Sequence, residues 1–225
     1  MQHIPLFLNL IFGLTCLLTV LLFLKAAHLS KPIALVIFAL ILVQTGLTLN
    51  GFYLIEDGLP PRVMLLIGPS FLSIILLFIL PEGKKTLNRL NLKFLTIIHI
   101  IRIPIEIVLY YLCMYKAVPE LMTFEGRNFD ILSGISAPIV YYLYFIKGKI
   151  SKQTLIIWNL ICLLLLVNIV VHAILSAPTP FQKMAFDQPN IAVLHSPFHL
   201  LPAIVVPLVF LSHLASIRLL LKRKK

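Results

Sequence analysis

Seven long apolar stretches, separated by short polar connections, constrain this chain more than any other feature of its sequence. A helix of roughly 20 residues crosses the ~30 Å hydrocarbon core of a bilayer, and each stretch is close to that length. The stretches are continuously apolar instead of alternating at every second residue, which favours helices over a transmembrane barrel. We expect spans at residues 5–25, 32–54, 62–81, 93–115, 130–147, 153–176 and 195–219.

The composition excludes a soluble fold. Hydrophobic residues make up 60% of the chain, charged residues only 12%, and the mean hydropathy is +1.03. A water-soluble core cannot bury that much apolar surface. We therefore predict an all-α fold, a polytopic membrane bundle of seven transmembrane helices in which residues 1–225 form a single domain. The first stretch is expected to stay as a helix, because no lysine or arginine precedes Ile4–Leu24 as in a cleaved signal peptide.

Lysine and arginine residues fall almost entirely in every second connection, and this pattern predicts an orientation. The connections of one side, with the C-terminal tail, hold 14 basic residues and one acidic residue, whereas the other side holds four basic and six acidic residues. Basic residues concentrate on the cytoplasmic loops of membrane proteins. We therefore expect the N-terminus outside and the C-terminus in the cytoplasm, in a plasma membrane or a bacterial inner membrane.

The net charge of +11 requires no nucleic-acid partner. The predicted orientation already accounts for the basic excess, and the tail Lys222–Lys225 is expected to lie on anionic lipid of the inner leaflet. The lipid bilayer is thus the predicted partner. Cys16, Cys113 and Cys162 fall in three different stretches, so the sequence predicts neither a disulfide framework nor a thiolate metal site.

The fourth stretch carries polar residues inside the membrane. His99, Arg102, Glu106 and Tyr110 fall on one face of a helix there. Counting from Lys93 places Glu106 about 20 Å into the bilayer, where a charge is costly unless it meets a partner or a wet cavity. Arg102 and Glu106 stand at i and i+4 and can neutralise each other. An architectural ion pair and a ligand site are therefore both open.

In the functional alternative, this polar face binds a small polar or anionic ligand, as in a transporter, receptor or sensor. Arg102 would donate to a carboxylate or phosphate, and Glu106 would take a proton or a cation. The expected ligand-binding residues are His99, Arg102, Glu106, Tyr110, Gln44, Asn168 and His172. An accessory subunit of a membrane complex, without a ligand of its own, is a further alternative.

The loop before the fifth stretch is the most polar segment outside the tail. Its candidate residues are Glu125, Arg127 and Asn128. If the loop is functional, Glu125 and Arg127 would cover the polar face of the fourth stretch. In the structural alternative, Asn128 or Asp130 caps the fifth helix.

The seventh stretch opens with a pair of histidines. His195 and His199 stand at i and i+4, a spacing at which two imidazoles can bind one zinc ion. The third ligand would come from His172, Asp187 or Glu125, with His172 as the first choice. This pair predicts a second function, a metal-dependent intramembrane hydrolase or lipid-modifying enzyme. It resembles the final helix of the alkaline ceramidase and adiponectin-receptor-like hydrolases, whose zinc site implies a further histidine on the second span. The second stretch of this chain has none.

Two other seven-helix families differ from this chain in a key feature. Rhodopsins hold retinal on a lysine in the last span, and the seventh stretch has no lysine, so retinal is excluded as a cofactor. The seven-helix sugar transporters of the 3+1+3 type have a similar length, but their Pro-Gln loop motif is missing here.

Overall fold

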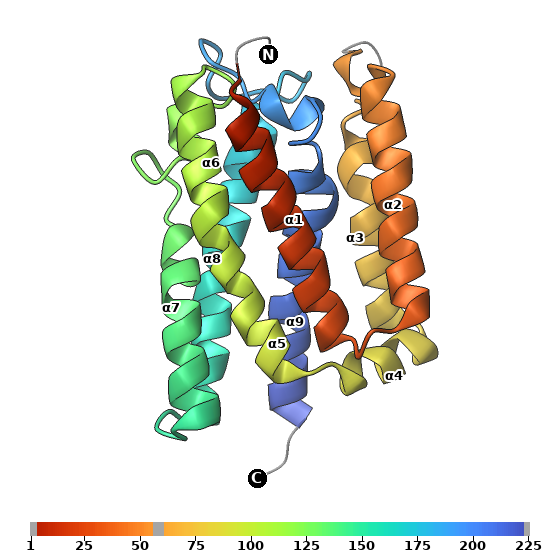
Figure 1. Ribbon diagram of the computed structural model, residues 1–225, viewed down its shortest axis with the longest axis vertical. Coiled ribbons are helices and arrows are strands. Elements are labelled where there is room, and N and C mark those ends of the chain that lie inside the picture. Colours follow the sequence, from red (N-terminus) through yellow and green to blue (C-terminus); the bar gives the residue numbers. More distant parts are fainter. Residues whose placement is uncertain (1–3, 56–60, 223–225) are drawn as a thin grey trace.

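The computed structural model describes residues 4–55 and 61–222 and places their helices side by side in one bundle (Figure 1). The described residues form helices and loops and contain no β-strand. The α-helices are α1 (Leu6–Ala26), α2 (Lys31–Leu49), α3 (Met64–Ile79), α4 (Pro81–Arg89), α5 (Leu92–Ile97), α6 (Arg102–Met114), α7 (Ile131–Tyr141), α8 (Lys152–Ser176) and α9 (Val206–Lys222). Glu56, Asp57 and residues 223–225, which contribute to the charge pattern above, lie outside the described residues.

The all-helical fold class is confirmed, and the chain is a multi-pass membrane protein. α1, α2, α8 and residues 201–222 are each long and apolar enough to cross a membrane, and α3 with α4 would make a fifth span bent by 92°. Large apolar side chains such as Leu10, Leu14 and Leu21 of α1 are exposed on the outside of the bundle. Polar side chains such as Arg102 and Glu106 are buried inside. A bilayer requires this distribution.

The helix α4 lies across one end of the bundle, where the sequence predicts only a connection (Figure 1). Leu80 takes an extended conformation before Pro81, and the chain turns sharply there. Gly83 then packs against the end of α3, since a Cβ at this position would stand 2.5 Å from the carbonyl oxygen of Leu77. The length of the apolar stretch does not reveal this turn, because α4 is polar and short.

The fourth expected span is a continuous run of helix that changes type at its centre. The 3-10 turn η2 (Ile98–Ile101) connects α5 to α6. Pro104 has no N–H to donate to the carbonyl of Ile100, so the tighter turn lies where an α-helical hydrogen bond is missing. His99 therefore belongs to η2, whereas Arg102 begins α6.

The last span has a similar change of helix type. The π-helical segment η6 (Leu201–Val205) precedes α9. Pro207 cannot donate to the carbonyl of Ala203, and the hydroxyl of Ser70 on α3 donates to that carbonyl instead. This hydrogen bond ties α3 to the start of the last span.

α7 begins part-way along α6 instead of level with its end (Figure 1). The two helices approach closely at Gly134, where a Cβ would stand 2.9 Å from Cγ1 and 3.0 Å from the backbone nitrogen of Ile103. Asp130 lies one turn before Gly134, and Arg102 directly precedes Ile103. The close approach therefore brings Asp130 and Arg102 together inside the bundle.

Candidate functional site

Arg102 is the centre of a buried hydrogen-bond network. Its guanidinium forms an ion pair with Asp130 and donates to Nε2 of His213 on α9 over 3.1 Å and to the carbonyl of Cys162 on α8 over 3.4 Å. Because Nε2 of His213 accepts, its Nδ1 carries the proton and donates to Oδ1 of Asn159 over 2.9 Å. Arg102 and Asp130 are only 2% and 4% exposed. One cation thus connects α6 to the start of α7, to α8 and to α9.

Glu106, one turn further along α6, has a different partner. Nδ2 of Asn128 lies 2.7 Å from both carboxylate oxygens and 3.0 Å from the carbonyl of Met122. Oδ1 of Asn128 accepts from the backbone N–H of Asp130 over 3.0 Å. The expected ion pair between Arg102 and Glu106 is therefore corrected: the loop before α7 enters the bundle and supplies Arg102 with another carboxylate.

His99 packs beside the network without joining it. Its ring stacks on that of His213, with centroids 3.8 Å apart, and the edge of Trp158 lies against it at 5.6 Å. Both ring nitrogens of His99 are buried and have no hydrogen-bond partner within the part of the chain that the structure covers. Its contacts are therefore those of an aromatic side chain.

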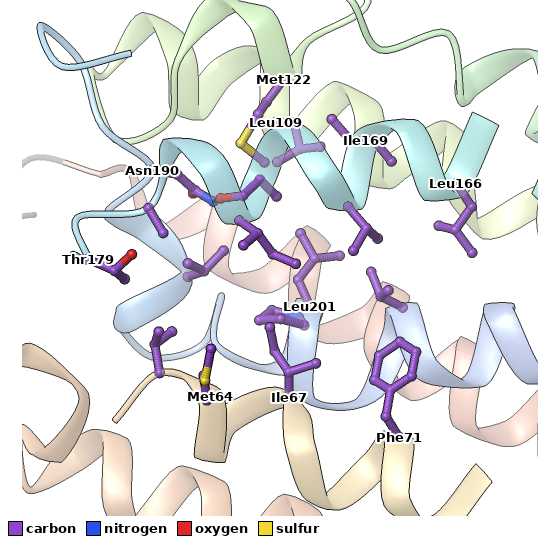
Figure 2. Close-up of a pocket in the computed structure, with 18 of the residues that line it drawn as sticks. Met64, Ile67, Phe71, Leu109, Met122, Leu166, Ile169, Thr179, Asn190 and Leu201 are labelled. Atoms are coloured by element: carbon purple, nitrogen blue, oxygen red, sulfur yellow. Dashed lines mark hydrogen bonds between the residues drawn. The ribbon is translucent and has the colours of Figure 1, made fainter. Parts of the chain in front are cut away.

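An apolar cavity of about 320 Å³ lies beside the network, between α3, α6, α8 and the start of the last span. Figure 2 shows Met64, Ile67 and Phe71 of α3 on one side and Leu166 and Ile169 of α8 on the other. Pockets that bind small molecules have volumes of roughly 300–1,000 Å³ and mostly apolar walls. The cavity is thus large enough for a small ligand with an apolar body.

Each of the four polar side chains that line this cavity can accept a hydrogen bond. Glu106 and Asp130 contribute carboxylates, and Asn190 and Thr179 line the end near the loop after α8 (Figure 2). Asn190 is 1% exposed, and its Oδ1 has no hydrogen-bond partner among residues 4–55 and 61–222. A buried acceptor without a donor is unfavourable. The cavity therefore suits a ligand that brings a donor or a cation.

Gln44 was expected to join the polar face, but it lies in another part of the bundle. Its side-chain Nε2 donates to the carbonyl of Leu65 over 3.0 Å, and its Oε1 accepts from the hydroxyl of Tyr53. Burial raises the pKa of Tyr53 to about 12, so the hydroxyl keeps its proton as a donor. Gln44 thus connects α2 to α3 through Leu65 and to the 3-10 turn η1 (Phe52–Leu54) through Tyr53.

Asn168, His172 and Tyr110 make local contacts away from the network. Asn168 donates to the carbonyl of Arg127 over 2.9 Å, and Nδ1 of His172 lies 2.8 Å from the carbonyl of Asn168. The ring of Tyr110 stacks on Phe124 with centroids 5.1 Å apart. Asn168 and Tyr110 thus contact the loop before α7, whereas His172 bonds within α8, and these contacts lie outside the network.

The loop before α7 contributes different residues from those expected. Glu125 and Arg127 are exposed, whereas Asn128 and Asp130 are buried in the network. The capping role considered for Asp130 is wrong, because it precedes α7 without a side-chain capping hydrogen bond. Asp130, Asn159 and His213 are the members of the network that the sequence did not predict.

The three histidines expected to bind zinc have other surroundings. The residues that the structure describes include no group of three or more His, Cys, Asp or Glu side chains placed to hold a metal ion. Nε2 of His199 lies 3.1 Å from the hydroxyl of Thr45, and His195 lines a separate recess with Asn9. The i, i+4 spacing alone did not bring a third ligand to the pair.

The fold and this site define an all-helical, multi-pass membrane protein with a buried polar network beside an apolar cavity. Residues 60–221 match the family described as Domain of unknown function (DUF8737), so the chain belongs to that family. The matched range contains α3 to α9 and every member of the network, whereas α1 and α2 precede it. The comparisons with curated proteins and with solved structures find no match.

Proposed function

We propose that this protein binds an amphiphilic small molecule inside the membrane, as a receptor, sensor or transporter does. One observation carries the proposal: two carboxylates, Glu106 and Asp130, and the amide oxygen of Asn190, which has no partner within the described part of the chain, line an apolar cavity of about 320 Å³. The ligand has an apolar body and an amine or another cationic donor group. The apolar body occupies the space between α3 and α8, and the donor group faces Glu106.

The charges of the network favour a cationic group over the anionic ligand that the polar face alone suggested. Arg102 is paired with Asp130, and among the residues that the structure describes Glu106 accepts side-chain hydrogen bonds only from the neutral amide of Asn128. With all three charged residues ionised, the network has one excess negative charge. A net charge inside a bilayer is costly, so a proton or a ligand cation stabilises the network by neutralising it.

The proposal includes seven membrane spans, with the N-terminus outside and the C-terminus in the cytoplasm. α5, η2 and α6 continue over residues 92–114, and α7 with the π-helical segment η4 (Tyr142–Ile146) covers residues 131–146. These two segments and α3 would add three crossings to the four long helices. The basic excess of every second connection supports the orientation. In this arrangement the Thr179 end of the cavity is on the outer side, in a plasma membrane or a bacterial inner membrane.

The test compares three ligands that share an apolar chain and differ in the head group. We expect dodecylamine to raise the unfolding temperature of the purified full chain in mild detergent more than dodecanol or dodecanoate does. Saturation at 100 times the Kd corresponds to a stabilisation of about 2.7 kcal/mol. Glu106→Gln should abolish the preference for the amine, and Glu125→Gln, a change at an exposed residue, should retain it.

Two results would contradict the proposal. The first is stronger stabilisation by dodecanoate than by dodecylamine, which would favour an anionic ligand over a cationic one. The second is the same absence of stabilisation with all three compounds, which would favour the accessory-subunit alternative.

A further inference from the structure

A second apolar groove, of about 400 Å³, lies on the α4 side of the contact between α3 and the last span. Its walls come from α2, α3 and α9, with residues such as Ile33, Ile74 and Leu208, and α4 closes one end. Ser70 and Ala203 line it, and their hydrogen bond joins the two helices there. Among the described residues, none lines both this groove and the first cavity, so the groove is a separate space.

The groove is open along one side of the bundle. Val36, Leu76 and Leu80 line it, and they are also 48%, 43% and 48% exposed. Exposed apolar residues on a membrane-spanning bundle face lipid tails. A lipid chain therefore reaches the groove sideways, without entering the bundle from its end.

Positive charge gathers where α4 closes the groove. Lys31 stands between the lining residues Ser30 and Pro32, and Lys84 follows the lining residue Gly83; both lysines are exposed. Residues 25–31 and 81–93 together hold six basic residues and one acidic residue. That acid, Glu82, also lines the groove and pairs with Lys85 at 2.6 Å.

We propose that this groove binds one anionic phospholipid. An acyl chain lies between α2 and α3, and the headgroup lies at the α4 end beside Lys31 and Lys84. Basic residues next to the membrane attract anionic headgroups. The two lysines neutralise the phosphate of the bound lipid. The α4 helix, which turns 92° from α3, is placed to lie along the membrane surface at the level of the headgroup. This site is independent of the ligand proposed for the first cavity.

The test measures lipid bound to the purified full chain by native mass spectrometry, with phosphatidylglycerol and phosphatidylcholine of identical acyl chains. We expect a preference of roughly tenfold or more for phosphatidylglycerol, and Lys31→Gln with Lys84→Gln should remove most of that preference. The matched control, Lys147→Gln with Lys149→Gln, removes the same charge from the exposed turn before α8 and should retain it. Ser73→Phe, which fills the groove, should lower the binding of both lipids.

Equal binding of the two lipids to the unchanged chain would overturn the proposal. So would an equal loss in the Lys147 and Lys149 control, because binding would then follow total charge and not this site. Unchanged lipid binding by Ser73→Phe would show that the acyl chain lies elsewhere, and this result stands apart from the charge measurements.

Discussion

At the scale of single residues, the stacked imidazoles of His99 and His213 differ in one property, their hydrogen bonds. His213 accepts from Arg102 and donates to Asn159, whereas both ring nitrogens of His99 are unpaired in the described structure. Leaving a buried polar group without its partner costs about 1–3 kcal/mol. We expect His213→Phe to lower the free energy of unfolding by about that amount and His99→Phe to leave it unchanged or raise it. Denaturant unfolding in detergent measures both.

The comparison contains its own control, because both substitutions replace an imidazole by a phenyl ring in the same stack. Equal destabilisation by the two variants would show that the stack, and not the hydrogen bonds of His213, carries the energy. A larger loss for His99→Phe would place His99 in the network.

The polar face of the fourth span was predictable from the sequence, but its partners were not. Arg102 and Glu106 stand out because they interrupt an apolar stretch at helical spacing. Asp130 and His213 lie 28 and 111 residues from Arg102, and only the folded loop and the packing of α9 bring them near. Asp130 also lies at the expected start of a helix, where a capping role is the simplest interpretation.

At the scale of helices, Gly134 decides how closely α7 approaches α6. A Cβ there would stand 2.9 Å and 3.0 Å from two atoms of Ile103, whereas Gly46 of α2 has no atom within 4 Å of the same position among the described residues. Overpacking costs about 1–3 kcal/mol, while replacing an unhindered helical glycine by alanine gains about 0.5–1 kcal/mol. We expect Gly134→Ala to destabilise the fold and Gly46→Ala to stabilise it, measured by thermal unfolding.

Moving α7 away from α6 also separates Asp130 from Arg102, so Gly134→Ala should weaken the amine preference in the ligand test. A Gly134→Ala variant as stable as the unchanged chain would show that the two helices need no close contact.

The sequence predicts which helices exist better than it predicts their ends. The apolar lengths place α1 and α8 to within a residue or two, because hydrophobic thickness sets these lengths. α2 ends earlier than expected, at Leu49, since Gly51 adopts a φ of +69° and breaks the helix. The turn into α4 and the change of helix type before Pro104 depend on local backbone hydrogen bonds, to which hydropathy is insensitive.

At the scale of the whole molecule, the membrane topology determines which side of the membrane the cavity serves. If α7 with η4 crosses the membrane, the loops before and after it lie on opposite sides; if it does not, both lie on one side. Glu125 and Lys149 are exposed residues of these two loops, and Asp187 is exposed in the loop after α8. The three residues therefore distinguish five spans from seven.

We expect a membrane-impermeant maleimide to label Glu125→Cys and Asp187→Cys in intact cells, and Lys149→Cys only after the cells are opened. The native thiols Cys16, Cys113 and Cys162 are first replaced by alanine. Labelling of Glu125→Cys and Lys149→Cys on the same side would contradict a crossing by α7. Labelling of Lys149→Cys alone in intact cells would reverse the orientation. The Thr179 end of the cavity would then face the cytoplasm, and the amphiphilic ligand would reach Glu106 from that side.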